Sequence, residues 1–91
     1  MLTAFVLINA EQSRIADLPQ ELAEVDGVYE VYSVAGAVDI VAVIRVRDHE
    51  DLAEVVTKRM SALTGILDTN TLLAFRAYSR HDLEAMFSLG T

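Results

Sequence analysis

A chain of 91 residues with 53% hydrophobic residues and no cysteine suits one small globular domain without disulfides. Its net charge of −7, with no basic stripe, argues against direct binding to the phosphate backbone of nucleic acids. Apolar runs such as Ile40 to Ile44 are too short to cross a bilayer, and the N-terminus has no basic segment typical of a signal peptide, so we expect a cytoplasmic protein that does not contact membranes.

The first part of the chain predicts a strand, a helix and a second strand. Residues 2–9 (LTAFVLIN) are rich in β-branched and large apolar side chains, which favours a strand. Apolar residues then recur with the spacing of one helix face at Ile15, Leu18, Leu22 and Val25. Because Pro19 is tolerated only in a first turn, we expect the regular helix to begin near Asp17 and to stop at Gly27. Residues 28–35 (VYEVYSVA) predict the second strand.

The middle of the chain predicts a hairpin followed by the clearest helix. Residues 38–46 (VDIVAVIRV) read as a third strand, joined to the second by a short link around Gly36. Residues 48–63 then carry an apolar stripe with helical spacing. Asp48 is a suitable N-cap and Gly65 closes the element, so we expect one regular helix here.

The last part predicts a fourth, long strand over residues 66–79, and a tail, residues 81–91, that could form a short helix. A weak repeat relates LAEVDGVY (residues 22–29) to MSALTGIL (residues 60–67) at the two helix-to-strand junctions. Two βαβ halves predict an α+β, ferredoxin-like βαββαβ fold, with a four-stranded antiparallel sheet and both helices on one face. We assign residues 1–80 to this domain.

The third strand raises the question of what covers the second face of the sheet. Its even-numbered residues from Val38 to Val46 are apolar, and so are Val41 and Val43 between them. Two helices can cover only one face of an antiparallel sheet. A partner sheet from a second chain is the simplest cover for the other face, which predicts a sheet-to-sheet homodimer.

Few side chains suggest catalysis. His49 and His81 are far apart in the sequence and read as solvated or capping residues, and no nucleophile or phosphate-binding motif occurs, so we expect no metal, no cofactor and no catalytic residue. Asp39 and Arg45 fall at opposite ends of one strand face, as rim charges would. Tyr29 and Tyr32 are three positions apart in a strand, which places them on opposite faces.

Gly36 and Asp39 allow two interpretations. Glycine permits a positive φ and aspartate can accept local backbone N–H bonds, which is ordinary hairpin chemistry. Alternatively, the open backbone at Gly36 admits a ligand or a neighbouring chain, and the Asp39 carboxylate pairs with a ligand cation. Residue spacing alone leaves both interpretations open.

The stretches AGAVDIVAVIRV, DHEDLAEVV and LTGILDTNTLLA resemble the effector-binding (RAM) domain of the Lrp/AsnC, or feast/famine, transcriptional regulators, over nearly all of residues 1–80. The most specific marks are Gly-x-x-Asp at Gly36 and Asp39, and Gly-β-branched-x-x-Thr-x-Thr ending at Thr69 and Thr71. The resemblance implies sheet-to-sheet dimers that join into rings. It also implies small effectors, commonly amino acids, bound between dimers near the Gly-x-x-Asp turn, with Gly36, Asp39, Thr69 and Thr71 as ligand-binding residues.

Two departures from the family pattern matter. Family regulators carry an N-terminal helix-turn-helix, whereas the first strand here begins at Leu2, and Val38 stands where an aromatic residue often precedes the motif aspartate. We therefore expect a stand-alone, non-enzymatic sensing and oligomerisation domain that modulates transcription indirectly, by co-assembly with full-length regulators. The alternatives are a small dimeric α+β-barrel enzyme of the monooxygenase or isomerase type, and a purely structural assembly module.

Overall fold

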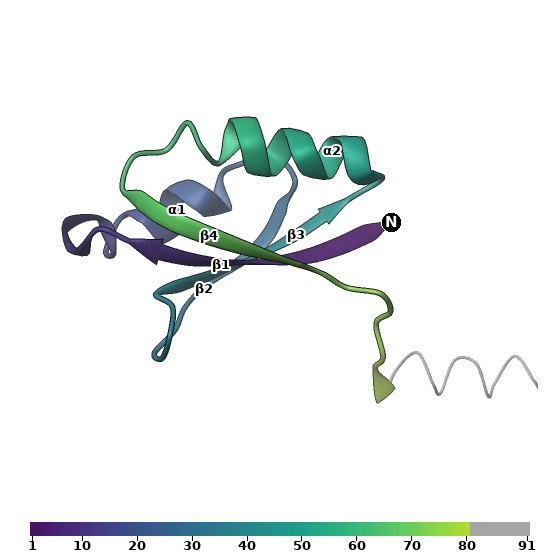
Figure 1. Ribbon diagram of the computed structural model, residues 1–91. Helices are drawn as coiled ribbons and strands as arrows, with labels where there is room; N and C mark the ends of the chain where they lie inside the picture. Colours follow the sequence, from purple (N-terminus) through teal and green to yellow (C-terminus); the bar gives the residue numbers. More distant parts are fainter. Residues whose placement is uncertain (81–91) are drawn as a thin grey trace, which may run out of the picture.

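A four-stranded antiparallel sheet with two helices on one face makes up the part of the chain that the computed structural model describes, residues 1–80 (Figure 1). The strand order across the sheet is β2-β3-β1-β4, which is the ferredoxin-like arrangement and confirms the predicted fold class. The regular elements are β1 (Leu2–Ala10), α1 (Leu18–Ala23), β2 (Val28–Ser33), β3 (Ile40–Val46), α2 (His49–Glu54) and β4 (Ile66–Leu73).

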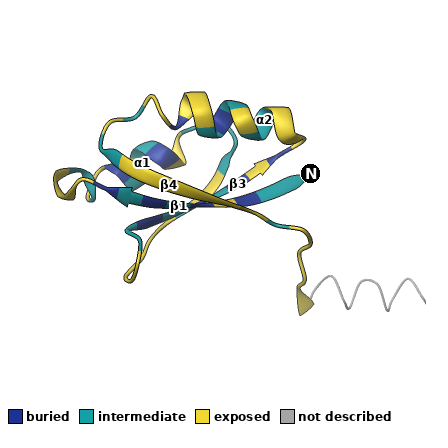
Figure 2. Ribbon diagram, in the orientation of Figure 1, coloured by how far each residue is buried: buried dark blue, intermediate teal, exposed yellow. Residues whose placement is uncertain are grey.

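The core lies between the helices and one face of the central strands (Figure 2). Residues alternate along β1 and β3, so that every second side chain points at the helices. Among residues 1–80 every fully buried side chain is apolar. The members of this core are Ala4, Val6, Ile8, Ala10, Leu18, Leu22, Ile40, Ala42, Ile44, Val46, Val55 and Met60.

The helix starts agree with the sequence, but the second helix is not regular throughout. Asp17 occupies the N-cap position of α1, after a short 3₁₀ turn, and the Asp48 carboxylate caps α2 by accepting from the Asp51 N–H at 2.9 Å. Beyond α2 the chain forms a π-helix, η2 (Val55–Arg59). In an α-helix, residues five apart point about 140° away from each other. The wider π turn lets both Val55 and Met60 face the core, which the predicted regular helix would not allow.

β4 is shorter than predicted, because it has only one neighbour in the sheet. It pairs with β1 from Ile66 to Leu73, and the Ala74 N–H makes a further bond to the Thr3 carbonyl at 2.9 Å. β1 itself begins at Leu2, so the residues that follow Ala74 have no further length of β1 to pair with. The predicted tail helix over residues 81–91 lies outside the described residues.

Candidate functional site

Asp39 lies just before β3 and is bound to the backbone of β1. Its Oδ2 accepts a hydrogen bond from the Ala10 N–H at 3.0 Å, and its own N–H donates to the Ile8 carbonyl at 3.0 Å. The β1–β3 pairing ends at Ile8 and Ile40, so the Ala10 N–H lies beyond the last pair and needs another acceptor. The Asp39 carboxylate, just before the apolar strand β3, therefore supplies the acceptor that the end of β1 needs, although Ala10 is 29 residues away in sequence.

Gly36 lies in the link between β2 and β3, which extends below the sheet and away from the helices in Figure 1. The link is the predicted hairpin, closed by a bond from the Val34 N–H to the Asp39 carbonyl at 3.0 Å. Gly36 has a φ of +139°, and no atom lies within 4 Å of the place where a Cβ would sit. The tip of the hairpin is open to an approaching molecule.

Thr69 and Thr71 lie on the other side of β1 from Asp39. Thr69 pairs with Ile8 and Thr71 with Val6, so both point to the helix side of the sheet, yet both are exposed on the edge strand. Two strand spacings, roughly 10 Å, separate β3 from β4. One chain thus brings Gly36 and Asp39 together, places Thr69 at the same end of the sheet, and puts Thr71 further along β4. The ligand-binding role of these four residues stays a prediction.

Near the Asp39 end of the sheet, Arg14 connects the segment after β1 to helix α1 and to the turn before β4. Its guanidinium contacts the Glu21 Oε1 at 2.6 Å and donates from Nε to the Thr64 carbonyl at 3.2 Å. The hydrogen bond to Glu21 raises the pKa of Arg14. The Glu11 N–H adds a bond to the Gly65 carbonyl at 2.8 Å. Side-chain and backbone contacts therefore hold together the segment after β1, helix α1 and the turn before β4.

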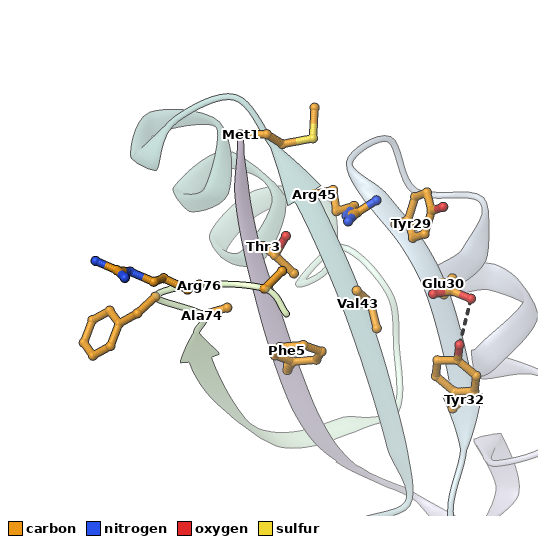
Figure 3. Close-up of a pocket in the computed structure, with 12 residues that line it drawn as sticks. Met1, Thr3, Phe5, Tyr29, Glu30, Tyr32, Val43, Arg45, Ala74 and Arg76 are labelled. Atoms are coloured by element: carbon orange, nitrogen blue, oxygen red, sulfur yellow. Dashed lines mark hydrogen bonds between the residues drawn. The ribbon is translucent and has the colours of Figure 1, made fainter. Parts of the chain in front are cut away.

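The opposite end of the sheet carries a shallow cavity of about 540 Å³ on the face without helices (Figure 3). The Arg45 guanidinium stacks over the Tyr29 ring at 4.7 Å from its centroid. The Tyr32 hydroxyl donates to Glu30 at 2.7 Å, and this bond raises the pKa of the Tyr32 phenol. The lining residues are Met1, Thr3, Phe5, Tyr29, Glu30, Tyr32, Val43, Arg45, Ala74, Phe75, Arg76 and Ala77.

Tyr29 and Tyr32 both line this cavity, so their predicted placement on opposite faces was wrong. The β2–β3 register shifts between Val28 and Glu30, which adds one residue to β2 at Tyr29. A bulge of this kind resets the alternation of side chains. Sequence reasoning missed the cavity for the same reason, although the apolar residue Phe5 on the second face of β1 was a signal that could have located it.

Other site types find no support in the described part of the chain. No three His, Cys, Asp or Glu side chains within residues 1–80 are grouped so that they could hold a metal ion. No helix in the same range is long and apolar enough to cross a membrane. His49 is the first residue of α2 and exposed, as the sequence predicted, whereas His81 lies outside the described residues.

The fold recurs in solved structures. The domain superposes on TTHA0845 from Thermus thermophilus with a TM-score of 0.81 and 50% sequence identity, over 88% of this chain and 100% of that one. It also superposes on the feast or famine regulatory protein Rv3291c from M. tuberculosis, complexed with L-methionine, with a TM-score of 0.74 and 28% identity, over 88% of this chain and 54% of that one.

Similarity to curated sequences and to a family model points the same way. The chain is 32% identical over 76 residues to the uncharacterized HTH-type transcriptional regulator PF0250 of Pyrococcus furiosus, over 80% of this chain and 51% of that protein. It therefore spans about half the length of the curated relatives it matches. The model of the Lrp/AsnC ligand binding domain matches residues 3–83. The chain therefore belongs to the Lrp/AsnC ligand-binding domain family.

Proposed function

We propose that this domain senses a small effector, an amino acid, and self-associates through the helix-free face of its sheet. It would then modulate transcription indirectly, by co-assembly with full-length regulators. The observation that carries the proposal is the family match over residues 3–83 on a matching fold. L-Methionine bound to a structural neighbour that is 28% identical supports an amino acid as the effector class.

Self-association is supported by the apolar side chains on the helix-free face. Phe5, Tyr32 and Leu72 are 38%, 48% and 47% exposed. Phe5 pairs with Leu72 on one side and with the half-buried Val43 on the other, and Tyr32 pairs with the half-buried Val41. The register places these residues on the same face of adjacent strands. A contiguous apolar surface of this kind marks an interaction site in a small domain.

A non-enzymatic role is favoured over the α+β-barrel enzyme. Such an enzyme needs an acid, a base or another polar group inside a cavity between sheet and helices. Within residues 1–80 the helix side of the sheet buries apolar side chains only, and the cavity lies on the opposite face. The cytoplasmic location expected from the sequence is part of the same proposal.

A thermal-shift screen of the amino acids tests the sensing function. A ligand that binds only the folded state raises the melting temperature, and the rise grows with the logarithm of the ligand concentration above its dissociation constant. We expect one amino acid, or a few related ones, to raise it with this concentration dependence. If none shifts the melting temperature at millimolar concentration, amino acid sensing by this chain is wrong.

A gel-shift assay tests whether the chain acts on DNA by itself. With a net charge of −7, we expect no saturable binding of duplex DNA even at low salt, where electrostatic attraction is strongest. A salt-sensitive, saturable shift by the protein alone would contradict the indirect mode of action.

A further inference from the structure

The chain that follows β4 carries the most exposed aromatic side chains of the described residues. After the Ala74 bond to Thr3, residues 74–80 leave the sheet and run away from the body of the domain (Figure 1). Phe75 is 98% exposed and Tyr78 is 78% exposed. Phe75 thus gains almost no contact from its own chain, although burial of an aromatic side chain is strongly favourable. We call residues 74–80 the arm.

The helix-free face offers a surface that suits the arm. The cavity beside Phe5 and Val43 is apolar at its floor and has the aromatic rings of Tyr29 and Tyr32 at one side (Figure 3). Its volume of about 540 Å³ exceeds that of one aromatic side chain, and the chain's own Phe75 stands at its rim without filling it. Offset or edge-on packing against such rings is the environment that phenylalanine prefers.

Glu30 in the cavity and Arg76 in the arm have opposite charges, which favours contact between the two. Glu30 lines the cavity and is bonded to the Tyr32 hydroxyl, with no cationic partner among residues 1–80. Arg76, next to Phe75 in the arm, forms no ion pair in that range and points away from the strands that bear Phe5 and Val43 (Figure 3). An arm laid on a second copy could bring this guanidinium to the unpaired carboxylate, which would offset part of the repulsion between two chains of charge −7.

We propose that the arm crosses to a second copy of this chain and places Phe75 in the cavity beside the partner's Phe5 and the partner's Val43. The exchange is reciprocal, because a two-fold axis puts the same patch of both copies in contact. The inference rests on the proposed self-association through the helix-free face, and adds the arm as a segment that contacts the partner.

Disulfide trapping tests the exchange directly, because the chain has no cysteine of its own. Phe75→Cys and Val43→Cys proteins are purified separately, mixed until subunits exchange, and oxidised mildly. We expect a reducible product of twice the 10.0 kDa chain mass that contains one chain of each variant. The matched control pairs Phe75→Cys with Ala53→Cys, an exposed position on α2, and should yield far less of this product.

Phe75→Ser provides the second measurement. Phe75 is exposed within its own chain, so the variant should fold as the wild type does, while the dissociation constant of the dimer rises about tenfold or more. Sedimentation measures this constant. An intrachain disulfide in a Val43→Cys/Phe75→Cys double variant would show that the arm folds onto its own sheet, and would overturn the exchange.

The outcomes separate the two proposals. A wild-type dimer whose dissociation constant is unchanged by Phe75→Ser, with no trapped product, overturns the arm exchange and leaves association through the sheet intact. A wild-type chain that stays monomeric at high micromolar concentration overturns the association itself, and the exchange with it.

Discussion

The two faces of the sheet are built from the same strands and are similarly apolar, yet only one is buried within the chain. On β1, Val6 and Ile8 are completely buried, whereas Phe5 between Ala4 and Val6 is 38% exposed. Helices α1 and α2 cover one face, and the chain supplies nothing comparable for the other within residues 1–80 (Figure 2). An antiparallel sheet in water needs only one apolar face, so the exposed second face is the surface on which the proposed self-association depends.

The largest expected effect comes from charging the buried face. Ile44→Asp places a carboxylate in a site with no solvent exposure and, among the described residues, no polar neighbour in the core. Burying an unpaired charge costs at least several kcal/mol, comparable with the total stability of about 5–15 kcal/mol of a small domain. We expect the variant to be unfolded by circular dichroism, and a cooperative melting transition would contradict the assigned register.

Val43→Asp makes the same change one residue away, on the helix-free face. The aspartate can reach water in the isolated chain, so we expect a folded domain whose self-association is abolished. Light scattering and circular dichroism on the same sample measure both properties. A Val43→Asp chain that unfolds as Ile44→Asp does, or one that still assembles normally, would remove the contrast between the faces.

Substitutions of Asp39 test whether its carboxylate both stabilises the fold and binds the ligand. Asp39→Ala leaves the Ala10 N–H without its acceptor and should cost about 1–3 kcal/mol of stability, while Asp39→Asn keeps an acceptor and should cost less. If the carboxylate also pairs with a ligand ammonium, both variants should lose about tenfold to a hundredfold in affinity. Calorimetric titration and melting curves separate the roles, and unchanged affinity would leave Asp39 with its structural role alone.

The two loop glycines offer the smallest and most local contrast. Gly65 has a φ of +94°, and a Cβ there would overlap the Cγ of Arg14, whereas Gly36 faces open space. Both alanine variants carry backbone strain of order 1 kcal/mol. Gly65→Ala must also displace Arg14 from Thr64 and Glu21, so it should lose roughly 1 kcal/mol more by denaturant unfolding. Equal losses would show that the Arg14 contacts contribute little.

Much of the contrast between the two faces of the sheet was predictable from the sequence, because it depends on the spacing of apolar residues along the chain. The helical stripe through Leu18 and Leu22 and the strand-like apolar runs of β1 and β3 predicted the element order and the fold class, and the apolar residues on both faces of β3 predicted the uncovered face. The position of Asp39 at the start of an apolar strand was equally visible. Its partner was not, because a bond from the Ala10 N–H joins segments whose distance is set by the β1–β3 register.

Local patterns in the sequence determined which elements form, since helix and strand periods are properties of neighbouring residues. Tertiary structure alone decided where those patterns break. The extra residue at Tyr29 brings two tyrosines to one face, the π turn brings Val55 and Met60 into one core, and β4 ends where β1 begins. The first and last of these breaks depend on strand partners distant in sequence, and the π turn depends on packing against a core that other elements complete. The end of β4 leaves Phe75 exposed beside an open sheet face.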